Sequence, residues 1–115
     1  MDNAYMGESD FRDTFYEATK SFKMTDKVVI ITGGAGLLGG RYATILAQAG
    51  AKVVLWDCKN KEILQAVCND INAASNRRNA VYFQADITKE AEVISAKDFV
   101  INTFGRIDVL INNAV

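Results

Sequence analysis

The architecture of this chain follows from one segment, Lys27-Val28-Val29-Ile30-Ile31-Thr32-Gly33-Gly34-Ala35-Gly36-Leu37-Leu38-Gly39-Gly40. An apolar, mostly β-branched run ends in five glycines within eight positions, as expected for a strand that enters a turn. Apolar residues at three- and four-residue spacings follow and predict a helix over 37–49 that Gly50 ends. A strand, a glycine turn and a helix in this order present unpaired backbone N–H groups and the positive end of a helix dipole to an anion.

The glycine segment is therefore interpreted as a cradle for the pyrophosphate of a dinucleotide. Glycine lets phosphate oxygens approach the bare backbone and permits dihedral angles that side chains forbid. A glycine-rich string alone is a weak signal, so the preceding strand and the following helix give it its weight. For Gly36 and Gly40 the alternative is a plain loop and close helix packing. The residues predicted to line the cofactor here are Gly33, Gly34, Gly36, Leu37, Leu38 and Gly39.

Strands and helices are predicted to alternate along the rest of the chain. Further strands are expected over 51–57, 80–86 and 107–112, and further helices over 59–74 and 90–104. Continuous apolar strands separated by helices indicate a parallel sheet covered on both faces. The predicted fold class is α/β, a doubly wound Rossmann-type parallel sheet, incomplete at about four strands in the order 3-2-1-4.

Two carboxylates at predicted strand ends extend the cradle. Asp57 lies 18 residues after Gly39 and could accept hydrogen bonds from both hydroxyls of an adenosine ribose while repelling a 2′-phosphate. NAD is therefore expected as the cofactor, with NADP less favoured. The alternative role for Asp57 is to cap the next helix. Asp86 could face an adenine amino group, with Ile87 beside it, or Asp86 or Thr88 could cap the helix that follows.

The chain is predicted to divide near residue 25. Residues 25–115 form the NAD(P)-binding domain, and residues 1–24 form a partly helical extension in which Ser9 could act as N-cap. Three phenylalanines of that extension are assigned to packing or to an oligomer contact: Phe11, Phe15 and Phe22.

Composition excludes several other classes of protein. The 115 residues are 50% hydrophobic and 23% charged, which is enough for one globular core. The net charge of −1, without a basic run, argues against nucleic acid or an anionic membrane as a main partner. With no histidine and only Cys58 and Cys68, no metal site is expected, and two free thiols indicate a reducing, cytoplasmic location.

Three ordered motifs resemble the short-chain dehydrogenase/reductase family. They are residues 32–39, Asp86-Ile87-Thr88 and the run 104–114, which ends in Asn112-Asn113-Ala114. The resemblance implies that Asn113 and Ala114 line the cofactor while Asn112 helps to hold the sheet. It also implies hydride transfer between a nicotinamide and a secondary alcohol or ketone, a sugar or sugar acid by loose analogy, in a homo-oligomeric parent enzyme.

The serine and the tyrosine–lysine pair that catalyse this reaction in the family lie beyond the fourth strand. The chain is therefore expected to be an inactive N-terminal part, truncated after that strand, and no catalytic residue is assigned within it. Tyr16 and Lys20 have the spacing of the family pair, but they precede the first strand and are assigned to a surface helix.

Two departures from the family pattern leave alternatives open. Val115 stands where glycine is usual, and Leu37 stands where compact members have the second glycine. The spacing through Gly36 and Gly39 is similar to the extended branch that acts on nucleotide sugars. An epimerase or dehydratase with bound NAD, or a non-catalytic nucleotide-binding fragment, are the alternatives.

Overall fold

The computed structural model describes residues 23–114, so the predicted N-terminal helix and Val115 lie outside the described residues. Four parallel strands pair in the order β3-β2-β1-β4 and confirm the predicted fold. The elements are β1 (Val28–Thr32), α2 (Leu37–Gln48), β2 (Lys52–Asp57), α3 (Lys61–Ser75), β3 (Ala80–Gln84), α4 (Glu90–Phe104) and β4 (Val109–Asn112).

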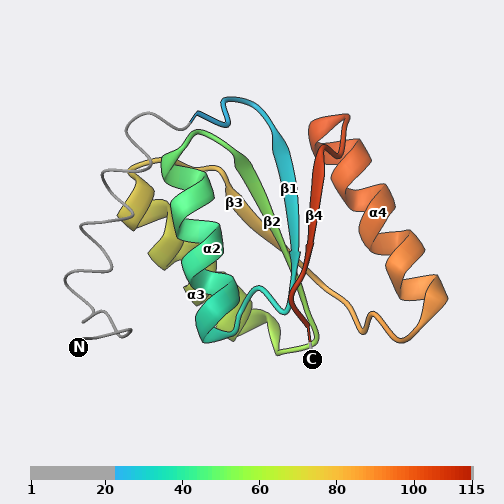
Figure 1. Cartoon of the computed structure of the whole chain (residues 1–115). Helices are drawn as coiled ribbons and strands as arrows, with labels where there is room; N and C mark the ends of the chain where they lie inside the picture. Colours follow the sequence, from blue (N-terminus) through green and yellow to red (C-terminus); the bar gives the residue numbers. More distant parts are fainter. Residues whose placement is uncertain (1–22, 115) are drawn as a thin grey trace, which may run out of the picture.

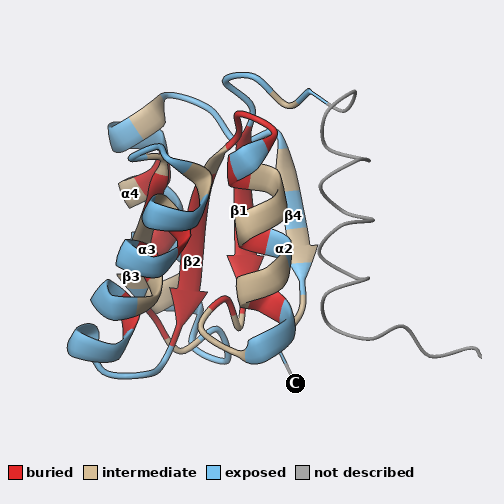
Figure 2. Cartoon of the chain, turned by 90° about the vertical axis from the view of Figure 1, so that its left-hand side faces the viewer, coloured by how far each residue is buried: buried red, intermediate tan, exposed pale blue. Residues whose placement is uncertain are grey.

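The sheet has a hydrophobic core on each face, because alternate residues of its central strands point in opposite directions. Val29 and Ile31 of β1 pack with α2 and α3, whereas Val28 and Ile30 pack with α4. Figure 1 shows α2 and α3 on one side of the sheet and α4 on the other. Figure 2 shows the burial concentrated in β1 and β2, the two central strands. Strands buried on both faces explain the continuous apolar runs of the sequence.

Most element bounds agree with the sequence prediction, and the differences have local causes. The helix predicted over 59–74 begins instead at Lys61, because the Asn60 side chain accepts a hydrogen bond from the N–H of Ile63 and caps it. The last strand begins at Val109 rather than at residue 107. There, Asp108 exchanges backbone and side-chain hydrogen bonds with Val28, at 2.9 and 2.8 Å.

Candidate functional site at the carboxyl end of the sheet

The predicted site residues lie at one end of the sheet, where parallel strands bring their carboxyl ends together. Thr32, the last residue of β1, lies opposite Trp56 of β2 and Asn112 of β4. In Figure 1 the β1–α2 connection and the end of β4 lie at this same end. In open α/β sheets, ligands bind in the crevice outside the carboxyl ends of the strands.

The glycine loop between β1 and α2 is anchored at its start and open at its end. The N–H of Gly33 donates to the backbone oxygen of Trp56 at 2.8 Å, and the N–H of Gly36 donates to Gly33 at 3.1 Å. The N-cap of α2 is Gly36, which has no side chain to cap the helix. Within the part of the chain that the structure describes, the first three helical N–H groups have no acceptor. These groups belong to Leu37, Leu38 and Gly39.

Close packing explains Gly34 in the loop and Gly39 in the first turn of α2, but not the two glycines suggested by the sequence. A Cβ on Gly39 would lie 2.5 Å from the backbone oxygen of Gly33, and one on Gly34 would lie 2.7 Å from the Leu55 side chain. The close-packing interpretation of Gly36 and Gly40 is wrong. A Cβ on Gly36 would meet only the Gly33 oxygen, at an ordinary 3.4 Å, and one on Gly40 would have its nearest contact at 4.0 Å.

Asp57 at the end of β2 is buried, with 7% of its surface exposed. Its Oδ2 accepts a hydrogen bond from the N–H of Ala35 in the glycine loop at 3.1 Å. Its Oδ1 accepts one from the N–H of Lys59 at 3.0 Å. The alternative that Asp57 caps α3 is wrong, because Asn60 occupies that position. The carboxylate therefore lies between the glycine loop and the β2–α3 turn.

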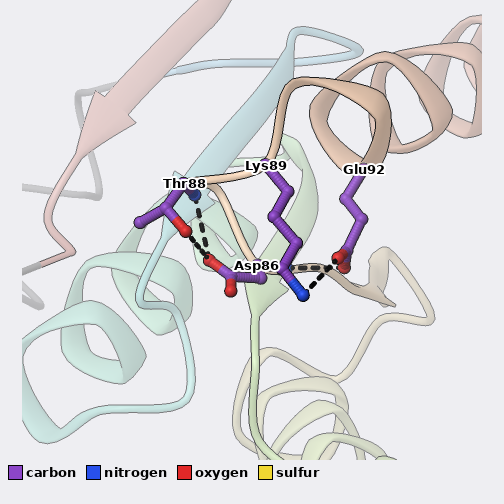
Figure 3. Close-up of polar contacts among 4 residues, drawn as sticks. All are labelled: Asp86, Thr88, Lys89 and Glu92. Atoms are coloured by element: carbon purple, nitrogen blue, oxygen red, sulfur yellow. Dashed lines mark hydrogen bonds and ion pairs between the residues drawn. The ribbon is translucent and has the colours of Figure 1, made fainter.

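Asp86 follows β3 and lies in a small polar cluster in front of α4 (Figure 3). Its Oδ1 accepts hydrogen bonds from the N–H and the hydroxyl of Thr88, at 3.0 and 2.6 Å, and these bonds lower the pKa of the carboxyl group. Glu92, an acid in the first turn of α4, reaches back to accept the N–H of Asp86 at 2.9 Å. The N-cap of α4 is Lys89, without a side-chain cap bond, so capping by Asp86 or Thr88 is wrong.

Thr32 links the end of β1 to the residues that follow β4. The sequence analysis assigned it no role. Its buried hydroxyl accepts hydrogen bonds from the N–H groups of Asn113 and Ala114, at 3.0 and 3.1 Å. It lies 3.2 Å from Oδ1 of Asn112, to which it can donate, and the Asn113 side chain donates to Gly33 at 3.4 Å. The available signal was a polar residue at the end of a buried strand, since such a group needs partners.

The remaining candidate features are the two cysteines, a metal site, the Tyr16 and Lys20 pair and a membrane-spanning helix. Cys58 is an exposed free thiol, and burial raises the pKa of the free Cys68 thiol to about 11. In residues 23–114 no group of His, Cys, Asp or Glu side chains could hold a metal ion. The Tyr16 and Lys20 pair lies outside the described residues. None of the described helices combines the length and the apolar character needed to cross a membrane.

Comparisons with known proteins identify the family. Residues 27–115 match the family model described as short chain dehydrogenase. Xanthoxin dehydrogenase of Arabidopsis thaliana is 31% identical over 99 residues, which are 86% of this chain and 34% of that protein.

Two solved structures give the same result. A xylitol dehydrogenase with bound NAD⁺ has a TM-score of 0.73 and 35% identity over 80% of this chain and 34% of its own. A levodione reductase has a TM-score of 0.75 and 37% identity over 80% of this chain and 35% of its own. The chain thus spans about a third of the length of these relatives. A family match over residues 27–115 and a shared fold show that this chain belongs to the short-chain dehydrogenase/reductase family.

Proposed function

We propose that this chain binds NAD and forms the cofactor-binding part of a short-chain dehydrogenase/reductase. The observation that carries the proposal is the uncapped start of α2, where Leu37, Leu38 and Gly39 leave three N–H groups without an acceptor among the described residues. Such groups, with the positive end of the helix dipole, favour a bound phosphate. No neighbouring protein atom would clash with a Cβ on Gly36, so packing does not require a glycine there. The missing side chain leaves space for the phosphate.

The adenosine half of NAD would lie toward β2 and β3. Asp57 would accept the ribose hydroxyls and disfavour a 2′-phosphate, which supports NAD over NADP. Asp86 has its Oδ2 free of hydrogen bonds from described residues, and the N–H of the exposed Ile87 has no acceptor there. An acceptor beside a donor matches the amino group and the neighbouring ring nitrogen of adenine.

The nicotinamide half would lie toward β4. Asn113 and Ala114 would line its ribose, held in place by the hydroxyl of Thr32. Bound NAD supplies the carbon that exchanges a hydride with a secondary alcohol or ketone. We assign the serine and the tyrosine–lysine pair of the family to sequence beyond the fourth strand, and none to this chain. A sugar or sugar acid is the substrate class we favour, in keeping with the xylitol dehydrogenase among the similar structures.

Cytoplasmic location and a homo-oligomeric parent enzyme stay predictions. The spacing of Gly36 and Gly39 resembles the extended branch and would favour an epimerase or dehydratase. We favour a dehydrogenase or reductase instead, and the names of the similar proteins, which are dehydrogenases and reductases, support this choice.

Fluorescence titration with NADH and with NADPH tests the proposal, because the two ligands differ only in the 2′-phosphate. We expect NADH to bind, and to bind at least tenfold more tightly than NADPH, since a phosphate dianion would lie against the Asp57 carboxylate. Tighter binding of NADPH would refute the role given to Asp57. If the folded chain bound neither ligand at millimolar concentration, the proposed function would be wrong.

A further inference from the structure

We infer that Asp57 is a positioning residue for the glycine loop, in addition to the ribose contact that the proposed function gives it. The inference rests on the proposed function only for its consequence in binding. Its structural basis is present in the chain without any ligand, because both carboxylate oxygens already accept backbone N–H groups.

The contacts of Asp57 reach three loops of the candidate site. Oδ2 accepts the N–H of Ala35 in the glycine loop, and Oδ1 accepts the N–H of Lys59 in the β2–α3 turn. The backbone oxygen of Asp57 accepts the N–H of Ala85, the first residue of the β3–α4 connection, at 2.9 Å. Residue 57 therefore links the segments proposed to hold the pyrophosphate, the ribose and the adenine.

Burial makes the two side-chain bonds important. Asp57 is 7% exposed as a residue, and no lysine or arginine of residues 23–114 forms an ion pair with its carboxylate. Its charge is thus stabilised by the N–H groups of Ala35 and Lys59. Hydrogen bonds to a charged acceptor are about twice as strong as neutral ones. Removal of the carboxylate would leave two part-buried N–H groups without their acceptors.

Among the described residues, the side chains of Asp57 and Asn113 form hydrogen bonds to this loop, and the bond between Asp57 and Ala35 is the shorter of the two. The start of the loop is held by the N–H of Gly33 on Trp56, and the Asn113 side chain donates to Gly33 at a longer 3.4 Å. The middle of the loop, immediately before the open N–H groups of α2, is held to β2 through Asp57. Loss of this bond should let those N–H groups move away from the geometry that grips a phosphate.

The inference predicts an outcome that a simple ribose contact does not. If Asp57 contacted only the ribose, its replacement would have no effect on a ligand without ribose hydroxyls. If Asp57 positions the loop, its replacement weakens that ligand too. A single substitution of Asp57 should then lower the affinity for NADH. For NADPH, the loss of loop geometry should offset the gain from removing the negative charge beside the 2′-phosphate, so no clean change of preference is expected.

The binding test uses an NADH analogue whose adenosine ribose is 2′,3′-dideoxy. We expect Asp57→Ala to weaken this analogue about tenfold or more, a loss typical of a hydrogen bond to a charged group. Asp57→Asn, which keeps one acceptor oxygen, should lose less. Asp70→Asn on the exposed surface of α3 removes the same charge elsewhere and should have no effect. Equal affinity of the analogue for Asp57→Ala and the unmutated chain would overturn the inference.

Amide hydrogen exchange, measured by NMR without ligand, decides the same question independently of NADH binding and of any variant. In the unmutated chain the Ala35 and Lys59 amides should exchange at least tenfold more slowly than the Leu37 amide, which has no acceptor in the described residues. If a folded Asp57→Ala chain is obtained, both amides should lose this protection. An Ala35 amide that exchanges as fast as Leu37 would overturn the inference, even if NADH binds as proposed.

Discussion

Four glycines of the segment 34–40, which spans the β1–α2 loop and the first turn of α2, are of two kinds that differ in what requires them. Gly34 and Gly39 are packed against the protein, where a Cβ would lie within 3 Å of neighbouring atoms. Gly36 and Gly40 face no such obstacle, and the backbone of Gly36, with φ −76° and ψ 170°, suits any residue. Glycines of one motif therefore meet two separate requirements, close packing within the protein and space for a ligand. The packed glycines let the loop close against the sheet, and we propose that Gly36 leaves space for a ligand.

The largest effect is expected for Gly39→Ala, which tests the packed pair of glycines, Gly34 and Gly39. The new Cβ would lie 2.5 Å from the Gly33 oxygen and 3.0 Å from the Asn113 side chain, so backbone must move. Overpacking of this kind costs about 1–3 kcal/mol of the free energy of unfolding. Urea unfolding followed by circular dichroism measures the loss. A midpoint equal to that of the unmutated chain would show that Gly39 is not required by packing.

A smaller effect, confined to ligand binding, is expected for Gly36→Ala. Since its Cβ would have only one ordinary contact, the free energy of unfolding should stay within about 0.5 kcal/mol. The affinity for NADH should nevertheless fall about tenfold, because the methyl group would occupy space at the open N–H groups of α2. Unfolding and NADH titration on the same sample separate the two readouts. Unchanged affinity would remove the distinction between ligand-facing and packed glycines.

The smallest effect is expected for Gly40→Ala, which also serves as the matched control for Gly39→Ala. Gly40 lies in the first turn of α2 with 4.0 Å to the nearest obstacle, so a methyl group fits. Alanine in a helix interior is favoured over glycine by about 0.5–1 kcal/mol, and stability should rise by that amount or less. Thermal unfolding measures the gain. A lower melting temperature would mean that the two glycines do not differ as described.

The candidate site was predictable where its signal is local. The free N–H groups of α2 follow from the helix start at Leu37, which the apolar spacing predicted correctly. The alternation of strands and helices also follows from periodicity, and α4 was predicted with its observed bounds, 90–104, because Gly105 ends it with a positive φ. Such signals lie within a few residues of the feature that they predict.

The sequence by itself determined the layered α/β architecture, since apolar strands and amphipathic helices must cover one another's faces. Only the tertiary structure decided what Asp57, Thr32 and the individual glycines do. Asp57 meets Ala35 across 22 positions of the chain, and Thr32 meets Asn113 across 81. Partners so distant are brought together by strand register and loop closure, and no local pattern records which hydrogen bonds a buried polar group finds there.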